Sequence, residues 1–374
     1  MALTEITGHD KPIARLTRAR CAGRLPHGLI FAGPEGIGKK LTAQHWGKLL
    51  LCKSPGSAGH ADQTSWPLGL TEIDDACGQC FSCRLVAAGN HPDLHLITRE
   101  LIKFTKEGKN RQGIALTIDV VREFLIAPAA TAPSQGGAAV FIIDGAEHIL
   151  PAAQNALLKT LEEPPGDTYI ILVTSRPDRL LPTVRSRCQT IFFNTLSLDF
   201  VSERLLATGV AESEAAYWAE FTQGSLGTAL GLSEMQLYDM ACELTRRLAG
   251  LTAANALDTA EWMVNAAKEY GKKVTEENKE YSASAATRDG QHQILNMLIH
   301  AFNRAMRCQV NYVADSYDTD AAIKEITSRF DLPAHADTVR ATHEAHEKID
   351  ANVNPTLIFE SLLLGYLQDM PVFV

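Results

Sequence analysis

One glycine-rich stretch constrains this chain more than any other feature. Gly33-Pro34-Glu35-Gly36-Ile37-Gly38-Lys39 follows the apolar run Leu29–Ala32 and opens the helical pattern Lys39–Leu51. The glycines let backbone N–H groups close around phosphate oxygens, the helix N-terminus adds a favourable dipole, and the lysine adds a positive charge. The order strand, loop, helix therefore predicts a phosphate-binding loop. Its candidate nucleotide-binding residues are Gly33, Gly36, Gly38 and Lys39.

The first half of the chain alternates short apolar runs with longer helical patterns, as in a parallel sheet with crossover helices. The runs are Leu29–Ala32, Leu94–Ile97, Val140–Ile143, Tyr169–Val173 and Thr190–Phe193. Pro151–Leu161 is a helical pattern that opens on a proline. Beyond about residue 195 strand-like runs become scarce. We expect an α/β P-loop domain with helices flanking a parallel sheet, followed by helical domains.

This pattern predicts three domains. The first covers residues 1–195 and contains a cysteine module at about 52–83; a small helical domain covers 196–235, and an all-α domain covers 236–374. Two polar or small-residue segments, Lys53–Ala76 and Lys268–Gly290, are interpreted as insertions or long loops.

Two positions depart from what a hydrolysing P-loop needs. The residue after the loop lysine should be Ser or Thr, whose hydroxyl holds Mg²⁺, and here it is Lys40, whose ammonium cannot ligate a cation. The strand ending at Asp144 resembles the acidic strand of an ATPase, yet Gly145 occupies the position that usually carries a catalytic glutamate. We expect Glu147 to point elsewhere, as an acidic residue at a helix start. The pattern predicts a degenerate site where ATP or ADP is optional and intrinsic hydrolysis is absent.

A cysteine cluster predicts a metal site. Cys77, Cys80 and Cys83 form two overlapping Cys-x2-Cys spacings, and Cys52 ends the preceding helical pattern. Four thiolates close a tetrahedral zinc site and leave no position for a substrate, so such a site is structural. Free thiols or a redox pair are the alternatives, and spacing alone leaves Cys52 open as the fourth ligand. The isolated cysteines 21, 188, 242 and 308 are expected to be buried thiols.

Charge and hydropathy exclude other classes. The 374 residues carry 35 basic and 44 acidic side chains, a net charge of −9, which makes autonomous DNA binding unfavourable. No stretch of about 18 apolar residues could span a membrane. The N-terminus has no apolar core of a secretory signal. We expect a cytoplasmic protein with no membrane partner.

Several motifs together resemble bacterial clamp-loader subunits of the AAA+ class. Besides the cysteine set, they are Gly23-Arg24-Leu25-Pro26-His27, Asn155-Ala156-Leu157-Leu158-Lys159-Thr160-Leu161-Glu162-Glu163-Pro164-Pro165, Arg185-Ser186-Arg187-Cys188 and, near the end of the chain, Asn352-Val353-Asn354-Pro355-Thr356-Leu357-Ile358-Phe359-Glu360. The resemblance covers nearly all of residues 5–195, and the last motif looks like the final helix of the loader's collar. It implies a AAA+ domain, a helical lid and an all-α collar for oligomerisation.

Within this family the chain is similar to a non-motor subunit. In this family the motor subunits, gamma and tau, carry Gly-Lys-Thr or Gly-Lys-Ser in the P-loop and an Asp-Glu pair after the acidic strand, where this chain has Lys39-Lys40 and Asp144-Gly145. An arginine follows the Gly-Ser-x pattern of the motor subunits, and at that position this chain has Gly227. The resemblance implies that Arg187 is an arginine finger reaching the γ-phosphate of a neighbouring subunit, and that Thr174 occupies the sensor 1 position. A planar, permanently charged guanidinium suits that role.

The implied function is that of a stator in the DNA polymerase III clamp loader. The implied partners are the motor subunits and the delta subunit in a hetero-pentamer, the sliding clamp, and primed DNA through the assembled complex. One alternative is an ATP-hydrolysing AAA+ motor with an unusual P-loop, against which Lys40 and Gly145 count. Another is a zinc-dependent nucleic-acid module, which the acidic balance disfavours.

Overall fold

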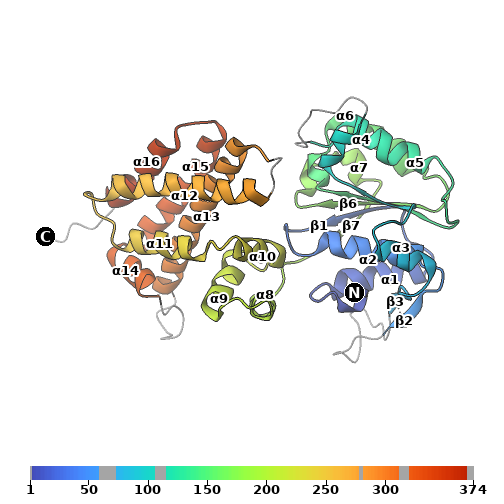
Figure 1. Ribbon diagram of the computed structural model, residues 1–374, viewed down its shortest axis with the longest axis horizontal. Coiled ribbons are helices and arrows are strands. Elements are labelled where there is room, and N and C mark those ends of the chain that lie inside the picture. The colour runs from blue at the N-terminus through green and yellow to red at the C-terminus, as the bar shows by residue number, and fades with distance from the viewer. Residues whose placement is uncertain (1, 59–72, 106–114, 278–280, 311–319, 369–374) are drawn as a thin grey trace. The chain divides into compact units, whose positions relative to one another are not determined.

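The computed structural model describes residues 2–58, 73–105, 115–277, 281–310 and 320–368. The chain divides into two compact units, residues 1–230 and 231–374, which we describe separately (Figure 1). No helix in the described ranges has the length and apolarity that crossing a membrane requires.

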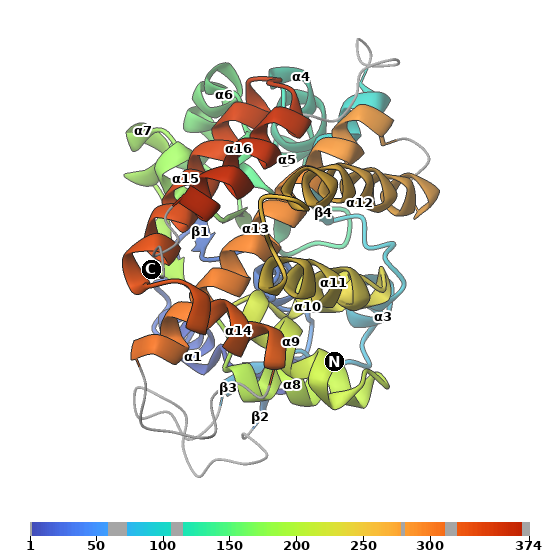
Figure 2. The same ribbon diagram turned by 90° about the vertical axis from the view of Figure 1, so that its left-hand side faces the viewer.

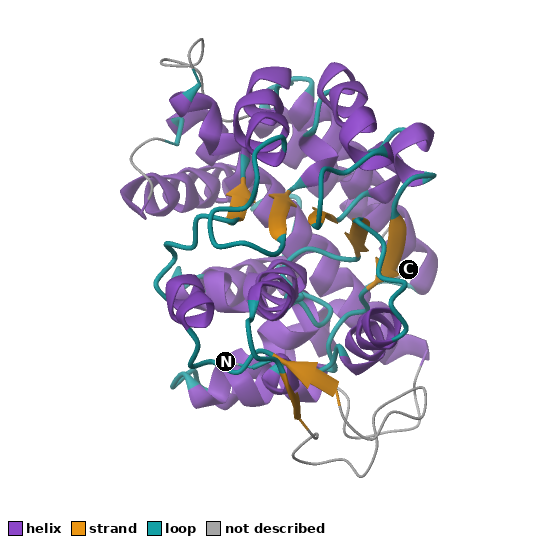
Figure 3. Ribbon diagram, turned by 90° about the vertical axis from the view of Figure 1, so that its right-hand side faces the viewer, coloured by secondary structure: helices purple, strands orange, loops and turns teal. Residues whose placement is uncertain are grey.

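The first unit is built on a five-stranded parallel sheet in the order β4-β5-β6-β1-β7. The strands are β1 (Gly28–Ala32), β4 (Leu94–Ile97), β5 (Ala139–Asp144), β6 (Thr168–Thr174) and β7 (Gln189–Phe192). Each expected apolar run forms one of them, with each end shifted by at most one residue. The sheet is a layer with helices on both sides (Figure 3). These observations confirm the expected α/β fold class.

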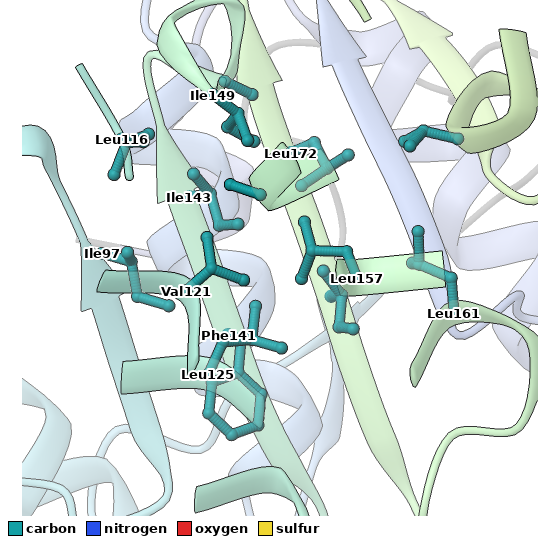
Figure 4. Close-up of a cluster of buried hydrophobic side chains, with 14 of the residues drawn as sticks. Ile97, Leu116, Val121, Leu125, Phe141, Ile143, Ile149, Leu157, Leu161 and Leu172 are labelled. Atoms are coloured by element: carbon teal, nitrogen blue, oxygen red, sulfur yellow. The ribbon is translucent and has the colours of Figure 1, made fainter. Parts of the chain in front are cut away.

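Helices cover both faces of the sheet because buried parallel strands are apolar on both sides. The helices of this unit up to β7 are α1 (Asp10–Cys21), α2 (Lys39–Leu51), α3 (Phe81–Ala87), α4 (Ile118–Val121), α5 (Ala127–Ala129), α6 (Pro151–Glu162) and α7 (Pro182–Arg185). On one face, Leu157 and Leu161 of α6 pack with Phe141 and Leu172 of the sheet (Figure 4). On the other, Trp46 of α2 is buried within the second core cluster. The two cores hold the loops at the strand ends in place.

A π-helical turn connects α4 and α5. Arg122–Ile126 forms this wider turn, and α5 follows it directly. Pro128 lies in α5 and has no N–H to donate to a preceding carbonyl. The π-turn is therefore the local adjustment to a proline inside an otherwise continuous helix.

A short antiparallel pair lies in the expected cysteine module. Strand β2 (Gly56–Ala58) pairs with β3 (Ile73–Asp75), so the segment Lys53–Ala76 contains strands as well as loop. The remainder of that segment, residues 59–72, lies outside the described residues.

A helical subdomain follows the sheet. It comprises α8 (Leu198–Ala207), α9 (Glu212–Phe221) and α10 (Leu226–Glu234), which runs across the division between the units. Ser197 caps α8 by accepting a hydrogen bond from the Phe200 N–H at 3.3 Å. The division at residues 195 and 235 stays a prediction.

The second unit is helical throughout its described residues (Figure 2). Its helices are α11 (Tyr238–Ala249), α12 (Ala256–Glu277), α13 (Ala283–Val310), α14 (Ala321–Arg329), α15 (Leu332–Asp350) and α16 (Pro355–Gln368). Helix α13 packs against α12, α14 and α15, and α16 packs against α12 and α15. The guanidinium of Arg329 donates to the carbonyls of Ala249 and Leu251, which ties α14 to the end of α11.

The interpretation of Lys268–Gly290 as a long loop is wrong. Most of this segment is the end of α12 and the start of α13, and residues 278–280 between them lie outside the described ranges. The segment has few large apolar side chains because small residues occupy the crossing of α12 and α13. A Cβ on Gly290 would lie 2.2 Å from the carbonyl oxygen of Ala267. The two backbones approach so closely that large side chains are excluded at this crossing.

Candidate functional site

The predicted phosphate loop lies between β1 and α2. Gly36 and Gly38 have φ values of +71° and +101°, which glycine adopts without strain. Gly38 precedes the first turn of α2, so the helix N-terminus opens directly onto the loop. The Lys39 side chain is buried, and its Nζ donates to the carbonyl oxygens of Gly33, at 2.7 Å, and Pro34. A glycine loop that leads directly into a helix N-terminus is a geometry that favours phosphate groups.

A cleft of about 740 Å³ surrounds the loop at the carboxyl ends of β5 and β6. Predicted residues Gly36, Gly38, Lys39, Lys40, Asp144 and Thr174 line it. Gly33 is not among the lining residues, although its carbonyl holds the Lys39 ammonium. The topology thus brings most of the predicted nucleotide-binding residues to one place.

Burial lowers the pKa of Lys39, although the nearby carboxylates of Glu147, Glu35 and Asp144 oppose that shift. Desolvation disfavours the charged ammonium, whereas the acidic neighbours favour it.

Lys40 neutralises the acidic residue of the cleft. Its Nζ lies 2.9 Å from Oδ2 of Asp144, and both side chains are partly exposed. The carboxylate at the end of β5 is thus paired with an ammonium of the chain itself. A divalent cation at that carboxylate would have to displace the ammonium and overcome its repulsion.

Contrary to expectation, Glu147 lines the cleft. The backbone N–H of Ser175 donates to Glu147 Oε1 at 3.2 Å, and the Ser175 hydroxyl donates to the same oxygen. Partial burial opposes ionisation, but the hydrogen bond from the Ser175 hydroxyl helps to lower the net pKa of Glu147. The short 3₁₀ turn Ala146–His148 directs the Glu147 side chain back toward β6. The sequence signal for this turn was Gly145, which has a φ of +72°.

Thr174 is buried at the end of β6. Its Oγ1 accepts a hydrogen bond from the Arg176 N–H at 3.0 Å.

The start of α10 is bonded directly to the phosphate loop, which sequence reasoning missed. Gly227 donates its N–H to the Gly36 carbonyl at 2.8 Å, and the Ser225 hydroxyl donates to the Glu35 carbonyl at 2.8 Å. A Cβ on Gly36 would lie 2.2 Å from Ser225 Oγ. The available signal was the set of small residues Gly224, Ser225 and Gly227, which allow another segment to approach closely.

The structure gathers the four predicted cysteines. The ligand atoms of Cys52, Cys77, Cys80 and Cys83 all lie within 4.8 Å of one another. Cys52 comes from the end of α2, and Cys80 caps α3, where its Sγ accepts the Cys83 N–H at 3.5 Å. The N–H groups of Cys80 and Cys77 likewise donate to the Sγ atoms of Cys77 and Cys52, both at 3.3 Å. This arrangement could hold one metal ion.

The backbone around the cluster favours thiolates at two of its positions. Burial opposes ionisation of Cys80, but the N–H groups of Cys83 and Lys53 help to lower its pKa to about 6. Backbone hydrogen bonds from Cys80 and Gln79 lower the pKa of Cys77. Burial raises the pKa of Cys52 and Cys83. Thiolates are the form that binds metal.

Arg187 lies away from the cleft of its own chain. It follows α7 and precedes β7, and its carbonyl oxygen would be 3.2 Å from a Cβ on Gly28, the first residue of β1. The phosphate loop follows Ala32, the last residue of β1. Arg187 is therefore separated from the loop by the length of β1, five residues that each advance by about 3.3 Å. Its partly exposed guanidinium bonds to Glu162 and to the Thr183 carbonyl. Arg187 is therefore not among the residues that line the cleft of its own chain.

The parallel sheet, the loop at the end of β1 and the cysteine module define a P-loop protein of the AAA+ class. Residues 8–197, just over half of the chain, match the family described as DNA polymerase III, delta subunit. The chain is 39% identical over 162 residues to the DNA polymerase III subunit delta' of Pseudomonas aeruginosa, which covers 43% of this chain and 41% of that protein. It is 34% identical over 220 residues to the Escherichia coli subunit delta', covering 58% of each chain.

A relative named subunit gamma/tau is less similar in sequence. The chain is 28% identical over 235 residues to the gamma/tau subunit of Mycoplasma pneumoniae, covering 61% of this chain and 30% of that protein. The chain belongs to the DNA polymerase III delta-subunit family, and it is similar to four proteins named DNA polymerase III subunit delta', at 31–39% identity. Its match to the first four delta prime relatives spans 41–58% of their lengths.

Proposed function

We propose that this chain is an ATPase-inactive stator of the DNA polymerase III clamp loader. It caps a hetero-pentamer with the gamma/tau and delta subunits, presents Arg187 to the neighbouring ATP site and helps to load the sliding clamp on primed DNA. The names of its relatives, DNA polymerase III subunit delta' and subunit gamma/tau, support this assembly. The observation that carries the proposal is the position of Arg187. It lies beside Gly28 at the start of β1, whereas the chain's own phosphate loop follows the other end of that strand.

Intrinsic hydrolysis is absent in this proposal because the cleft lacks the required metal chemistry. The Lys40 ammonium occupies the Asp144 carboxylate at 2.9 Å, and Gly145 supplies no base. A nucleotide in the cleft would contact the loop N–H groups and Lys39 without being turned over. ATP or ADP is therefore an optional ligand.

The cysteine cluster is a structural zinc site in this proposal. Cys52, Cys77, Cys80 and Cys83 supply four sulfur ligands, which suit tetrahedral Zn²⁺, and leave no position open for a substrate. When bound, the metal would link the end of α2 to the start of α3. Its function is to hold the module together.

The test is ATP hydrolysis by a reconstituted loader. The other motor sites carry inactivated P-loops, so only the site next to this chain is active. Arg187→Ala should leave assembly intact and slow single-turnover hydrolysis by about 10³-fold or more, since an arginine finger stabilises the transition state by that order. Arg246→Ala is a matched control, because it removes an exposed arginine that lies on α11 in the other unit.

Unchanged hydrolysis by the Arg187→Ala loader would refute the finger assignment. Robust Mg²⁺-dependent turnover by the chain alone would refute the stator and favour the motor alternative.

A further inference from the structure

The Arg187 guanidinium is held on several sides by its own chain. Its Nε donates to Oε1 of Glu162 at 2.6 Å, and its Nη2 forms an ion pair with the same oxygen. Its Nη1 donates to the Thr183 carbonyl at 2.9 Å and to the Ser186 hydroxyl at 3.3 Å. These contacts fix the plane of the guanidinium, because its donors have a rigid fork geometry.

Glu162 belongs to a rigid element. It is the last residue of α6, whose Leu157 and Leu161 are buried against the sheet (Figure 4). A carboxylate at a helix C-terminus is disfavoured by the helix dipole, and a bound guanidinium offsets that cost. Thr183 lies on α7, so the contacts tie Arg187 to two helices. The side chains of Arg187 and Glu162 remain 35% and 47% exposed, which leaves the pair open to an approaching subunit.

The carboxylate does not exhaust the donors of Arg187. A guanidinium has five N–H groups, and the contacts above leave at least one N–H of Nη2 available. A phosphate oxygen can therefore be bound while Glu162 still holds the other edge of the fork.

We propose that Glu162 is the positioning residue that orients Arg187 toward the γ-phosphate of the neighbouring subunit's ATP. This inference rests on the proposed function of Arg187. Orientation contributes to rate because a misplacement of about 1 Å can slow a reaction by 10²-fold. An exposed salt bridge that contributes only to folding stability would leave the reaction rate unchanged.

The experiment uses the full-length chain in the reconstituted loader with one active site. Glu162→Ala should slow single-turnover hydrolysis by about 10- to 10²-fold with the apparent KM for ATP unchanged. Glu162→Gln retains an oxygen that accepts from Nε and should restore most of the rate. Glu163→Ala is the control, because Glu163 is the adjacent exposed residue beyond the helix.

The double variant Glu162→Ala/Arg187→Ala should be no slower than Arg187→Ala alone, because Glu162 acts only through Arg187. A further loss in the double variant would overturn the inference. So would a wild-type rate for Glu162→Ala beside a slow Arg187→Ala, whereas a wild-type rate for Arg187→Ala would refute the proposed function itself.

Loader assembly is checked by gel filtration for each variant. If Glu162→Ala does not assemble, Glu162→Asp decides the question, because it keeps the charge and withdraws the carboxylate by one methylene. An intermediate rate supports the inference, and a wild-type rate overturns it.

Discussion

At the scale of single residues, Lys40 changes what the phosphate loop can hold. Its ammonium supplies the positive charge that a metal ion would otherwise bring to Asp144, and the 2.9 Å ion pair fixes it there. The loop, Lys39 and Thr174 remain in place around the same cleft. The residues proposed to bind phosphate are therefore distinct from those that would bind a metal.

Lys40→Thr should make ADP binding dependent on Mg²⁺. The substitution frees Asp144 and restores a hydroxyl, and a charge-assisted contact of about 1.5–3 kcal/mol corresponds to roughly a tenfold or greater gain in affinity. Calorimetric titration with Mg²⁺ or with EDTA measures the difference. Lys48→Thr, on the same helix but outside the cleft lining, is the control. Equal ADP affinities of Lys40→Thr in both buffers would contradict the prediction.

How far the sequence could predict the site depends on the range of the signal. Gly33-Pro34-Glu35-Gly36-Ile37-Gly38-Lys39 is a local motif whose backbone geometry follows from its glycines, so the loop was predictable. The bond from Gly227 to Gly36 joins backbone atoms almost 200 positions apart, so the small residues around Gly227 could not by themselves identify the loop as their partner. Glu147 was misplaced because a tight 3₁₀ turn redirected its side chain.

At the scale of elements, the cysteine module links α2 to α3 through side chains and N–H···S contacts. The cysteine spacing predicted this link because ligand geometry requires it, whereas helices α12 and α13 were missed in part. Their polar, small-residue crossing lacks the apolar periodicity that reveals a helix in a sequence.

Metal analysis of the purified chain should give about one zinc per chain. Cys80→Ser removes a ligand and should lower both zinc content and melting temperature, by about 2–4 °C for each 1 kcal/mol lost from a unit of this size. The expectation that the Cys21 thiol is buried is wrong, because Cys21 is exposed. Cys21→Ser, outside the cluster, should retain the metal. An unchanged melting temperature and zinc content for Cys80→Ser would rule out the structural site.

Gly290→Ala should destabilise the second unit. Its Cβ would lie 2.2 Å from the Ala267 carbonyl oxygen, and overpacking of this kind costs about 1–3 kcal/mol. Gly365→Ala in α16 is the matched control: no atom lies within 4 Å of its Cβ, so the better helix former should stabilise by about 0.5–1 kcal/mol. Urea unfolding measures both. Equal midpoints for the two variants would show that the helix crossing tolerates a side chain.

At the scale of the whole molecule, the second unit contains histidines that fold in the neutral form. Burial, assisted by Arg304 and Arg307, lowers the pKa of His300 to about 3. Burial lowers that of His335 to about 4, against the opposing charge of Asp331. Their ordinary value of 6.5 applies in the unfolded chain, so the unfolded state binds more protons between these values. Stability is thus fully present above about pH 6.5 and falls as the pH falls toward 4.

As the pH falls from about 6.5 toward 4, the free energy of unfolding of the second unit should decrease by up to about 1.4 kcal/mol per pH unit for each of these histidines. Denaturant unfolding of the full chain between pH 7 and pH 4 measures the slope. His335→Gln removes one titrating group and should flatten it. A slope identical to that of the wild type would show that His335 is protonated in the folded state.

The bonds between the phosphate loop and the start of α10 have a mechanical consequence. In this chain, main-chain and hydroxyl groups bridge the loop to the helix that follows β7 and α9, through Gly36–Gly227 and Glu35–Ser225. Parting the loop from α10 would leave the carbonyl oxygens of Glu35 and Gly36 in need of other donors, so these bonds favour keeping the two segments together.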